Sequence, residues 1–96
     1  MLEERSAGVI LFNRAEGLQF LVLKYPSGHW DFVKGNIEQG EKEEETVKRE
    51  LFEETGINSI TLHKGFNEKV EYHYYKKNKR VHKIVSYYLA ETEQKD

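Results

Sequence analysis

Three glutamates in the middle of the chain restrict its fold more than any other feature. They are Glu50, Glu53 and Glu54, in the segment GNIEQGEKEEETVKRELFEETGI at residues 35–57. In a helix, side chains three and four positions apart share one face, so these carboxylates would crowd together. Like charges at this spacing destabilise a helix, and a hard cation such as Mg²⁺ or Mn²⁺ would offset the repulsion. The plainer interpretation is a solvated acidic helix face.

The residues around this triad favour the metal site. Their spacing follows the pattern G-x5-E-x7-R-E-U-x-E-E-x-G-U, where U is a bulky aliphatic residue, at all nine fixed positions. This pattern is the Nudix box, and the chain resembles the Nudix hydrolases. The residues that carry the match are Gly35, Glu41, Arg49, Glu50, Leu51, Glu53, Glu54, Gly56 and Ile57.

Physical chemistry supports the parts of this match. Gly35 permits backbone geometry that other residues resist, which suits a loop whose carbonyl oxygens face an ion. Arg49 can hold a carboxylate through a forked pair of hydrogen bonds. Val47 and Leu51 are four positions apart and supply the buried side of the helix, and Gly56 suits a left-handed helix end.

Strands flank the helix, which predicts the mixed α/β class. We expect the helix at Glu43–Thr55, without a Ser, Thr, Asp or Asn cap at its start. Trp30 is expected in the core, and the polar tail at 91–96 is expected to fray. Valine, isoleucine and tyrosine enrichment predicts strands at 6–12, 18–24, 30–33, 70–75 and 81–90, with turns near 13–17, 25–28 and 76–79.

Length and composition indicate one domain with few special requirements. The 96 residues suffice for a modest core, and the net charge of −2 does not announce a nucleic-acid or membrane partner. The absence of cysteine excludes disulfides, thiol nucleophiles and cysteine-based zinc sites. No apolar run is long enough for a signal peptide or a membrane span, so we expect a cytoplasmic location.

The resemblance implies an α/β/α sandwich, in which a mixed sheet lies between the box helix and a C-terminal helix. Residues 1–96 would then form a single Nudix-like domain truncated before that second helix. One sheet face would be left uncovered, as an apolar surface that invites a partner or a second copy. The chain is then either a fragment or a minimal domain that associates into a homo-oligomer, and the sequence does not choose between them.

Three further segments carry a narrower resemblance. They are GHWDFVKGNIE at 28–38, Gly65-Phe66 and Glu71-Tyr72. These segments are similar to those of the asymmetric diadenosine tetraphosphate hydrolases, although Val33 stands where those enzymes usually have proline and Asn36 where many have histidine. This resemblance implies metal-dependent cleavage of diadenosine tetraphosphate to ATP and AMP.

The resemblance also implies roles around the triad. Two or more Mg²⁺ or Mn²⁺ ions would clamp phosphate oxygens and acidify the attacking water. Glu50 is the candidate central ligand and a candidate base, whereas some relatives take the base from a later loop. The implied catalytic residues are Arg49, Glu50, Glu53 and Glu54, and the implied metal ligands are Gly35 through its backbone oxygen, Glu50, Glu53, Glu54 and Glu41 as an outer ligand or support.

Candidate substrate contacts lie outside the triad. His29 and Lys34 could contact phosphates, since both supply hydrogen-bond donors beside the box. Tyr72 could stack on a purine, and Lys83 could neutralise a highly charged substrate. Each has a plainer interpretation, namely an exposed loop residue for His29, strand packing for Tyr72 and a solvated hairpin edge for Lys83.

Two other functions stay open. One is hydrolysis of another nucleoside diphosphate derivative or of RNA 5′ ends, in which the basic segment 76–83 would touch an RNA backbone. The other is a non-catalytic nucleotide-binding or assembly module, motivated by the early end of the domain. The intact glutamate triad argues against it, because a degenerate site would be expected to lose such costly charges.

Overall fold

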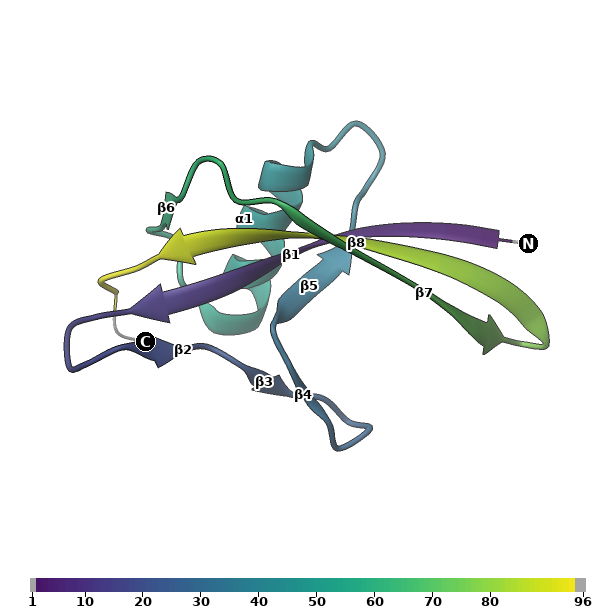
Figure 1. Cartoon of the computed structure of the whole chain (residues 1–96), viewed down its shortest axis with the longest axis horizontal. Coiled ribbons are helices and arrows are strands. Elements are labelled where there is room, and N and C mark those ends of the chain that lie inside the picture. Colours follow the sequence, from purple (N-terminus) through teal and green to yellow (C-terminus); the bar gives the residue numbers. More distant parts are fainter. Residues whose placement is uncertain (1, 95–96) are drawn as a thin grey trace.

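Two long parallel strands form the centre of the structure (Figure 1). The computed structural model describes residues 2–94. In it, β1 (Leu2–Asn13) and β8 (Lys79–Glu91) pair from Leu2 opposite Val81 to Phe12 opposite Glu91. Alternate residues of both strands face opposite sides of the sheet, so this register decides which side chains share a face.

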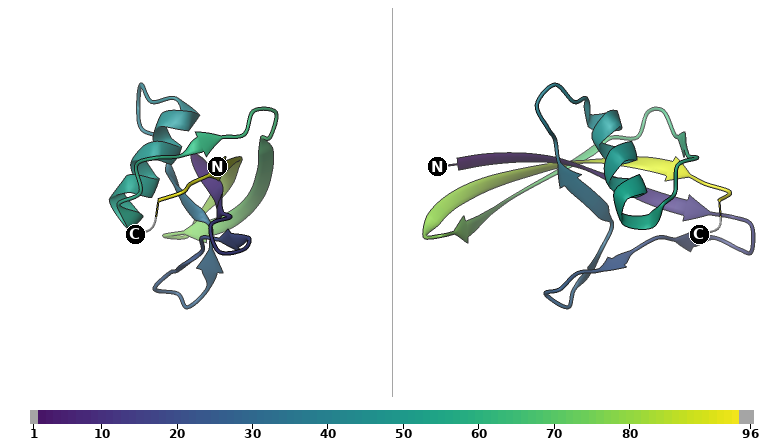
Figure 2. Two further views of the ribbon diagram at one scale, coloured as in Figure 1. Left: turned by 90° about the vertical axis from the view of Figure 1, so that its left-hand side faces the viewer. Right: turned by 180° about the vertical axis from the view of Figure 1, so that it is seen from behind.

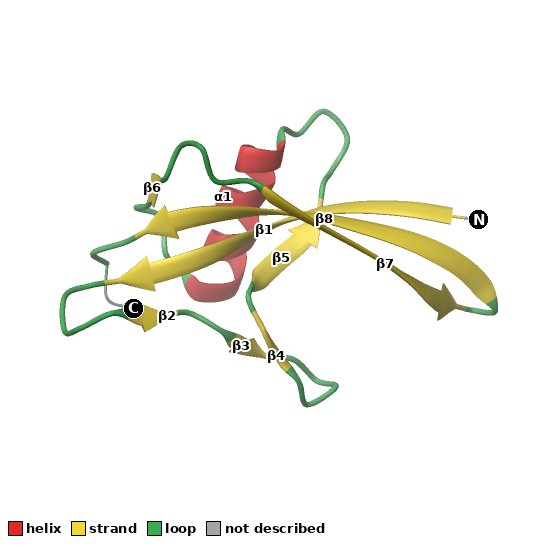
Figure 3. Cartoon of the chain, viewed as in Figure 1, coloured by secondary structure: helices red, strands yellow, loops and turns green. Residues whose placement is uncertain are grey.

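Shorter strands extend the central pair into a mixed sheet (Figure 3). Strands β2 and β5 run antiparallel to β1, while β6 and β7 run antiparallel to β8. Strands β3 and β4 form a separate two-stranded ladder. The bounds are β2 Gln19–Phe20, β3 Leu23–Lys24, β4 Trp30–Asp31, β5 Val33–Asn36, β6 Thr61–Leu62 and β7 Glu68–Lys76.

A single helix, α1 (Glu43–Thr55), covers one face of this sheet in the described part of the chain (Figure 2). It begins and ends where the sequence predicts. Val47 and Leu51 are buried as expected, and they pack in a core with Ala7, Val9, Leu11, Val33, Ile57 and Ala90. The mixed sheet and the box helix confirm the predicted fold class.

Local hydrogen bonds explain both ends of α1. Gly56 adopts the predicted left-handed conformation, with φ of 79°, and its N–H donates to the carbonyl of Phe52 at 2.9 Å. At the start, no side chain of the usual capping type is present, and the Glu45 carboxylate instead accepts from the Lys42 N–H at 2.8 Å. The helix therefore satisfies part of its first turn with its own glutamate.

Some expectations from the sequence are wrong. Trp30 is not in the core but 63% exposed, because β4 pairs only with β3 in a ladder that α1 does not cover. Gly35 lies in β5 opposite Ala7, not in a loop. The single strands expected at 18–24 and at 30–33 are each interrupted, so that β2 and β3 belong to different ladders, as do β4 and β5.

The segment after β8 is also more ordered than its composition predicts. Thr92 is buried, and the side-chain oxygen of Gln94 accepts hydrogen bonds from the N–H groups of Asn58 and Ser59 at 3.1 and 3.3 Å. These contacts fix residues up to Gln94 against the loop after α1. The last two residues of the expected frayed tail, 95 and 96, lie outside the described part of the chain.

Apolar side chains lie exposed beside β2. Leu18 and Phe20 are 63% and 52% exposed, and Val22 is exposed as well. This agrees with the expectation that part of the apolar surface is left without cover. No helix in residues 2–94 combines the length and the apolar character needed to cross a bilayer.

Candidate functional site

Arg49 lies at the centre of a cluster of carboxylates on α1 and the loop before it. Its Nε and Nη2 atoms donate to the two oxygens of Glu41 at 2.7 and 3.1 Å, in the forked arrangement expected of an arginine beside the triad. Its Nη1 donates to Glu50 at 2.8 Å and to Glu53 at 3.3 Å. One guanidinium group thus offsets the repulsion between three glutamates.

Glu41 holds Arg49 in this cluster through several hydrogen bonds. Besides Arg49, its carboxylate accepts from the buried Thr46 hydroxyl at 2.6 Å and from the Glu38 N–H at 3.1 Å. The hydrogen bonds from Arg49, then from Thr46 and Glu38, lower the pKa of Glu41 to about 2. Glu41 therefore stays ionised and holds Arg49 in place, which fits the supporting one of its two predicted roles.

Gly35 brings β5 into contact with the Glu50 carboxyl group. A Cβ atom on residue 35 would overlap that carboxyl group, and Gly35 does not have the positive φ found at five other glycines. Glycine is thus required here for space and not, as the sequence suggested, for an unusual backbone conformation. The close approach brings the backbone of β5 at Gly35 against the Glu50 carboxyl group.

Glu54 completes the acidic face of α1. Burial, reinforced by the negative charges of Glu50 and Glu53, raises the pKa of Glu54. The charges of Glu50 and Glu53 thus act on Glu54, as expected of carboxylates that share one helix face. A group in this position favours either a proton or a neighbouring cation.

The carboxylates on α1 suit a divalent metal ion chemically, although their oxygen atoms do not converge on one point. The carboxylates of Glu50, Glu53 and Glu54 are hard oxygen ligands on one helix face. Among residues 2–94, no three acidic or histidine side chains converge closely enough to hold an ion. Since Arg49 engages one oxygen of Glu50 and one of Glu53, metal binding requires these side chains to turn away from it.

Lys34 and Tyr72, two of the predicted substrate residues, lie together. The Lys34 ammonium is 5.8 Å from the centre of the Tyr72 ring and 3.1 Å from the Asp31 carboxylate. Burial alone would lower the pKa of Lys34, but the hydrogen bond to Asp31 and the neighbouring tyrosines outweigh it and raise the pKa. The pair thus combines a cation with an exposed aromatic face.

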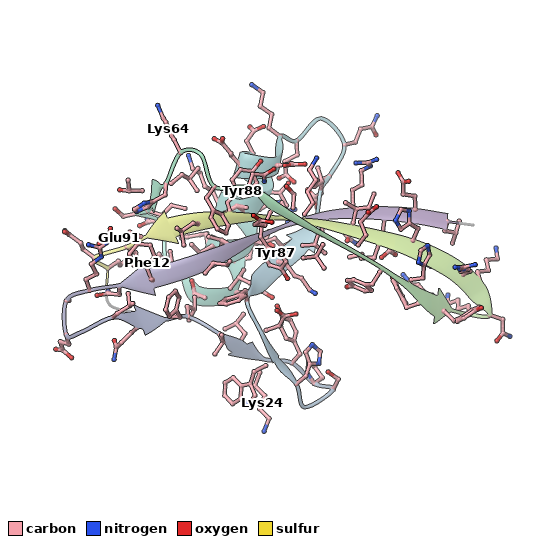
Figure 4. The ribbon with its side chains drawn as sticks, viewed as in Figure 1. Phe12, Lys24, Lys64, Tyr87, Tyr88 and Glu91 are labelled. Atoms are coloured by element: carbon pink, nitrogen blue, oxygen red, sulfur yellow. The ribbon has the colours of Figure 1, made fainter. Side chains whose placement is uncertain are left out.

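Two tyrosines near this pair were not predicted. Tyr87, labelled on β8 in Figure 4, packs over Gly8, where a Cβ would lie 2.8 Å from its ring. Its ring also lies edge-on to that of Phe32. Burial raises the pKa of the Tyr25 hydroxyl most strongly. The negative charge of Glu54 raises this pKa further, and the positive charge of Lys34 lowers it. Tyr87 could have been found from strand alternation, because it lies four positions after Lys83 and therefore on the same face.

Lys83 lies in a network within the protein. Its ammonium donates to Asn36 Oδ1 at 3.0 Å and to the Glu4 carboxylate at 3.3 Å, and its side chain is mostly buried. Glu4 also accepts from the Tyr74 hydroxyl, which lowers the pKa of Glu4 and raises that of Tyr74 to about 12. Two of the three donors of Lys83 are thus already used by protein groups.

His29 lies in the turn between β3 and β4. It is exposed, stacks on Tyr25 with ring centres 5.4 Å apart, and contacts the Ser27 hydroxyl. Its contacts are thus within the turn. The stacking on Tyr25 is its link to the site, because Glu54 and Lys34 both shift the pKa of the Tyr25 hydroxyl.

A groove of about 700 Å³ adjoins Glu54. It lies between the end of α1, the loop after it and the strands β1 to β3, and no motif in the sequence indicated it. Apolar side chains line much of it, among them Leu11, Phe12, Phe20, Leu21, Leu23 and Ile57.

Comparisons with known proteins agree with this geometry. The family model described as NUDIX domain matches residues 2–96. Asymmetrical bis(5′-nucleosyl)-tetraphosphatase from Sus scrofa is 34% identical over 103 residues, covering 96% of this chain and 67% of the relative. The Mus musculus protein of that name is 36% identical over 98 residues, covering 91% of this chain and 64% of the relative.

A solved structure has a similar fold. The crystal structure of Caenorhabditis elegans Ap4A hydrolase superposes with a TM-score of 0.76 at 34% identity, covering 95% of this chain and 68% of that one. The chain spans about two thirds of the length of these relatives. With the box, the fold and the family model in agreement, the chain belongs to the NUDIX family, that of the Nudix hydrolases.

Proposed function

We propose that this chain carries the active site for metal-dependent hydrolysis of a nucleoside polyphosphate, and that its substrate is diadenosine tetraphosphate, cleaved asymmetrically to ATP and AMP. The observation that carries the proposal is the Arg49-centred carboxylate cluster packed against Gly35. The tetraphosphatase relatives support the choice of substrate.

The acidic face of α1 would hold the metal. Glu50, Glu53 and Glu54, with backbone oxygen from Gly35, are the groups that would bind Mg²⁺ or Mn²⁺. When bound, the ion neutralises phosphate oxygens and makes a water molecule more acidic. Glu41 holds Arg49 in place. Arg49 can therefore orient Glu50 and Glu53 until they leave it to bind the metal ion. Glu50 would also be the candidate base for the attacking water, once its contact with Arg49 is given up.

Lys34 and Tyr72 would bind the rest of the substrate. A long polyphosphate carries several negative charges beyond the reacting phosphate, and the Lys34 ammonium supplies a partly buried positive charge for them. The Tyr72 ring, exposed beside Lys34, offers a surface on which a purine can stack. His29 at the rim and Lys83, through its remaining donor, would be weaker contributors.

One observation favours a second substrate class. An RNA pyrophosphohydrolase from Erythrobacter litoralis is 45% identical over 56 residues, although these cover only 55% of this chain and 34% of the relative. The hairpin tip carries Lys77, Lys79 and Arg80, all exposed, and could meet an RNA backbone. We rank this second, because the tetraphosphatase similarity extends over nearly the whole chain.

A turnover screen tests the proposal. The chain is incubated with Mg²⁺ or Mn²⁺ and with dinucleoside polyphosphates, nucleoside triphosphates, nucleotide sugars or 5′-triphosphorylated RNA. We expect turnover of diadenosine tetraphosphate to ATP and AMP, with ¹⁸O from labelled water in one of these unequal products. Two equal nucleoside diphosphates would refute the asymmetric assignment, and turnover of RNA alone would favour the second class. Activity that survives Glu50→Gln without loss would refute the site itself.

A further inference from the structure

The outer edge of β7 has no partner strand among residues 2–94. This nine-residue strand pairs only with β8, and the β7–β8 hairpin projects from the end of the sheet, well away from α1 (Figure 1). Its residues are exposed or half-exposed, and they include three large side chains, Val70, Tyr72 and Tyr75, the last 75% exposed. An unpaired edge of this length is a template for another strand.

The turn at the tip of the hairpin determines which backbone groups face outward. Lys77 and Asn78 both have positive φ, 52° and 65°, as in a two-residue type I′ turn. Such a turn is closed by a hydrogen-bonded pair, here Lys76 and Lys79, and hydrogen-bonded residues alternate along an antiparallel strand. The odd-numbered residues, 69, 71, 73 and 75, therefore direct their N–H and C=O groups away from β8.

The side chains of β7 complement a second copy of the same strand. If two β7 strands run antiparallel with a two-fold axis at Tyr72, Glu68 lies opposite Lys76 of the second copy and Glu71 lies opposite its His73. Val70 then lies opposite Tyr74, and odd-numbered residues meet odd-numbered residues, as the backbone requires. Opposite charges and apolar or aromatic pairs across strands are stabilising.

Neighbouring registers are less favourable. An axis at Glu71 would place two Glu71 carboxylates face to face, and an axis at His73 would place Val70 opposite Lys76. Charged residues on an edge strand usually prevent pairing. In β7 they have both signs, and the register centred on Tyr72 places Glu68 opposite Lys76 and Lys69 opposite Tyr75, so that no two like charges lie directly opposite each other.

We propose that β7 is a self-association edge, through which two copies of this chain join their sheets into one continuous sheet. Eight main-chain hydrogen-bonding groups from each copy would face the other. A single strand edge buries much less than the roughly 1,200 Å² of a stable interface, so the dimer is reversible. The inference does not rest on the proposed function, although it places the Tyr72 rings of both copies at the two-fold axis.

Sedimentation velocity tests the association and its charges. Wild-type chain is measured from low micromolar to millimolar concentration, and we expect a monomer–dimer equilibrium. Glu68→Lys, which faces Lys76 of the second copy, should weaken the dimer about tenfold, because each dimer contains this pair twice. The charge-swapped variant Glu68→Lys with Lys76→Glu should restore it. Thermal unfolding of each variant verifies that the fold is retained.

Cysteine cross-linking tests the register, since the chain has no cysteine of its own. Tyr72→Cys places two thiols across the axis and should give a covalent dimer under mild oxidation. The matched control Lys69→Cys lies on the same strand but far from its counterpart, and should cross-link much more slowly. A chain that stays monomeric throughout would overturn the proposal. So would a dimer that Glu68→Lys leaves unchanged and that Phe20→Ser disrupts, since it would then form through the exposed apolar surface beside β2.

Discussion

A methyl group at position 35 tests whether the close approach of β5 to α1 fixes the position of Glu50. In Gly35→Ala the added Cβ would overlap the Glu50 carboxyl group. Gly35 does not have a left-handed conformation, so alanine meets no backbone penalty of its own. Any loss of stability is therefore due to displacement of Glu50.

The size of the effect follows from the contacts of Glu50. Its displacement breaks the 2.8 Å hydrogen bond from Arg49, and a hydrogen bond to a charged group contributes about 1.5–3 kcal/mol. A side chain forced about 30° off its rotamer costs about 0.5–1.5 kcal/mol more. We therefore expect Gly35→Ala to lower the free energy of unfolding by about 2–4 kcal/mol.

A double-mutant cycle in urea isolates the steric cause. In the Glu50→Ala background the clash is gone, so Gly35→Ala should change the free energy of unfolding by less than about 0.5 kcal/mol. The control is Gly40→Ala, where a Cβ has open space but φ is 81°, and which should cost about 1–2 kcal/mol in both backgrounds. An equal cost of Gly35→Ala in the two backgrounds would refute the reasoning.

Three further predictions concern the site. Because the pKa of Glu41 is lowered to about 2 from an ordinary value of 4.5, its stabilising effect is complete above pH 4.5 and is lost as pH falls through 2; Glu41→Gln should flatten this part of the profile of unfolding free energy against pH. In calorimetric titration with Mn²⁺, Glu50→Gln and Glu54→Gln should each weaken binding at least tenfold, whereas the exposed Glu44→Gln should not; unchanged binding in both would exclude the triad as the metal site. Tyr72→Ala should raise KM for diadenosine tetraphosphate several-fold more than it lowers kcat, and a selective loss of kcat would contradict a stacking role.

Contacts close in sequence were predictable. The bounds of α1, its buried pair Val47 and Leu51, and the left-handed Gly56 follow from helical periodicity and glycine chemistry, which act within one or two turns. The crowding of the triad follows from the same geometry. The sequence predicted that Arg49 would hold a carboxylate, but it did not identify this carboxylate as that of Glu41, eight positions earlier.

Contacts between distant segments were not predictable. Trp30 is a large aromatic residue of the kind often found in cores. Its burial depends on which strand β4 pairs with, and short-range sequence patterns do not determine that pairing. The requirement for glycine at 35 depends on the distance between β5 and α1. The acceptors around Lys83 come from Glu4 and Asn36, 79 and 47 positions away, so sequence spacing carried no sign of them.

Asn36 stands where many asymmetric tetraphosphatases have histidine, and its contacts show which parts of the structure depend on the asparagine side chain. Its backbone oxygen accepts from Arg49 at 3.0 Å, while its side-chain oxygen accepts from Ser6 at 2.8 Å and from Lys83 at 3.0 Å. A backbone carbonyl is present whatever the side chain, so a histidine at this position could keep the contact with Arg49. Only the Lys83 side of the sheet depends on the asparagine. The substitution therefore bears on the charge network around Lys83 and leaves intact the contacts of the carboxylate cluster, the site that we propose for hydrolysis.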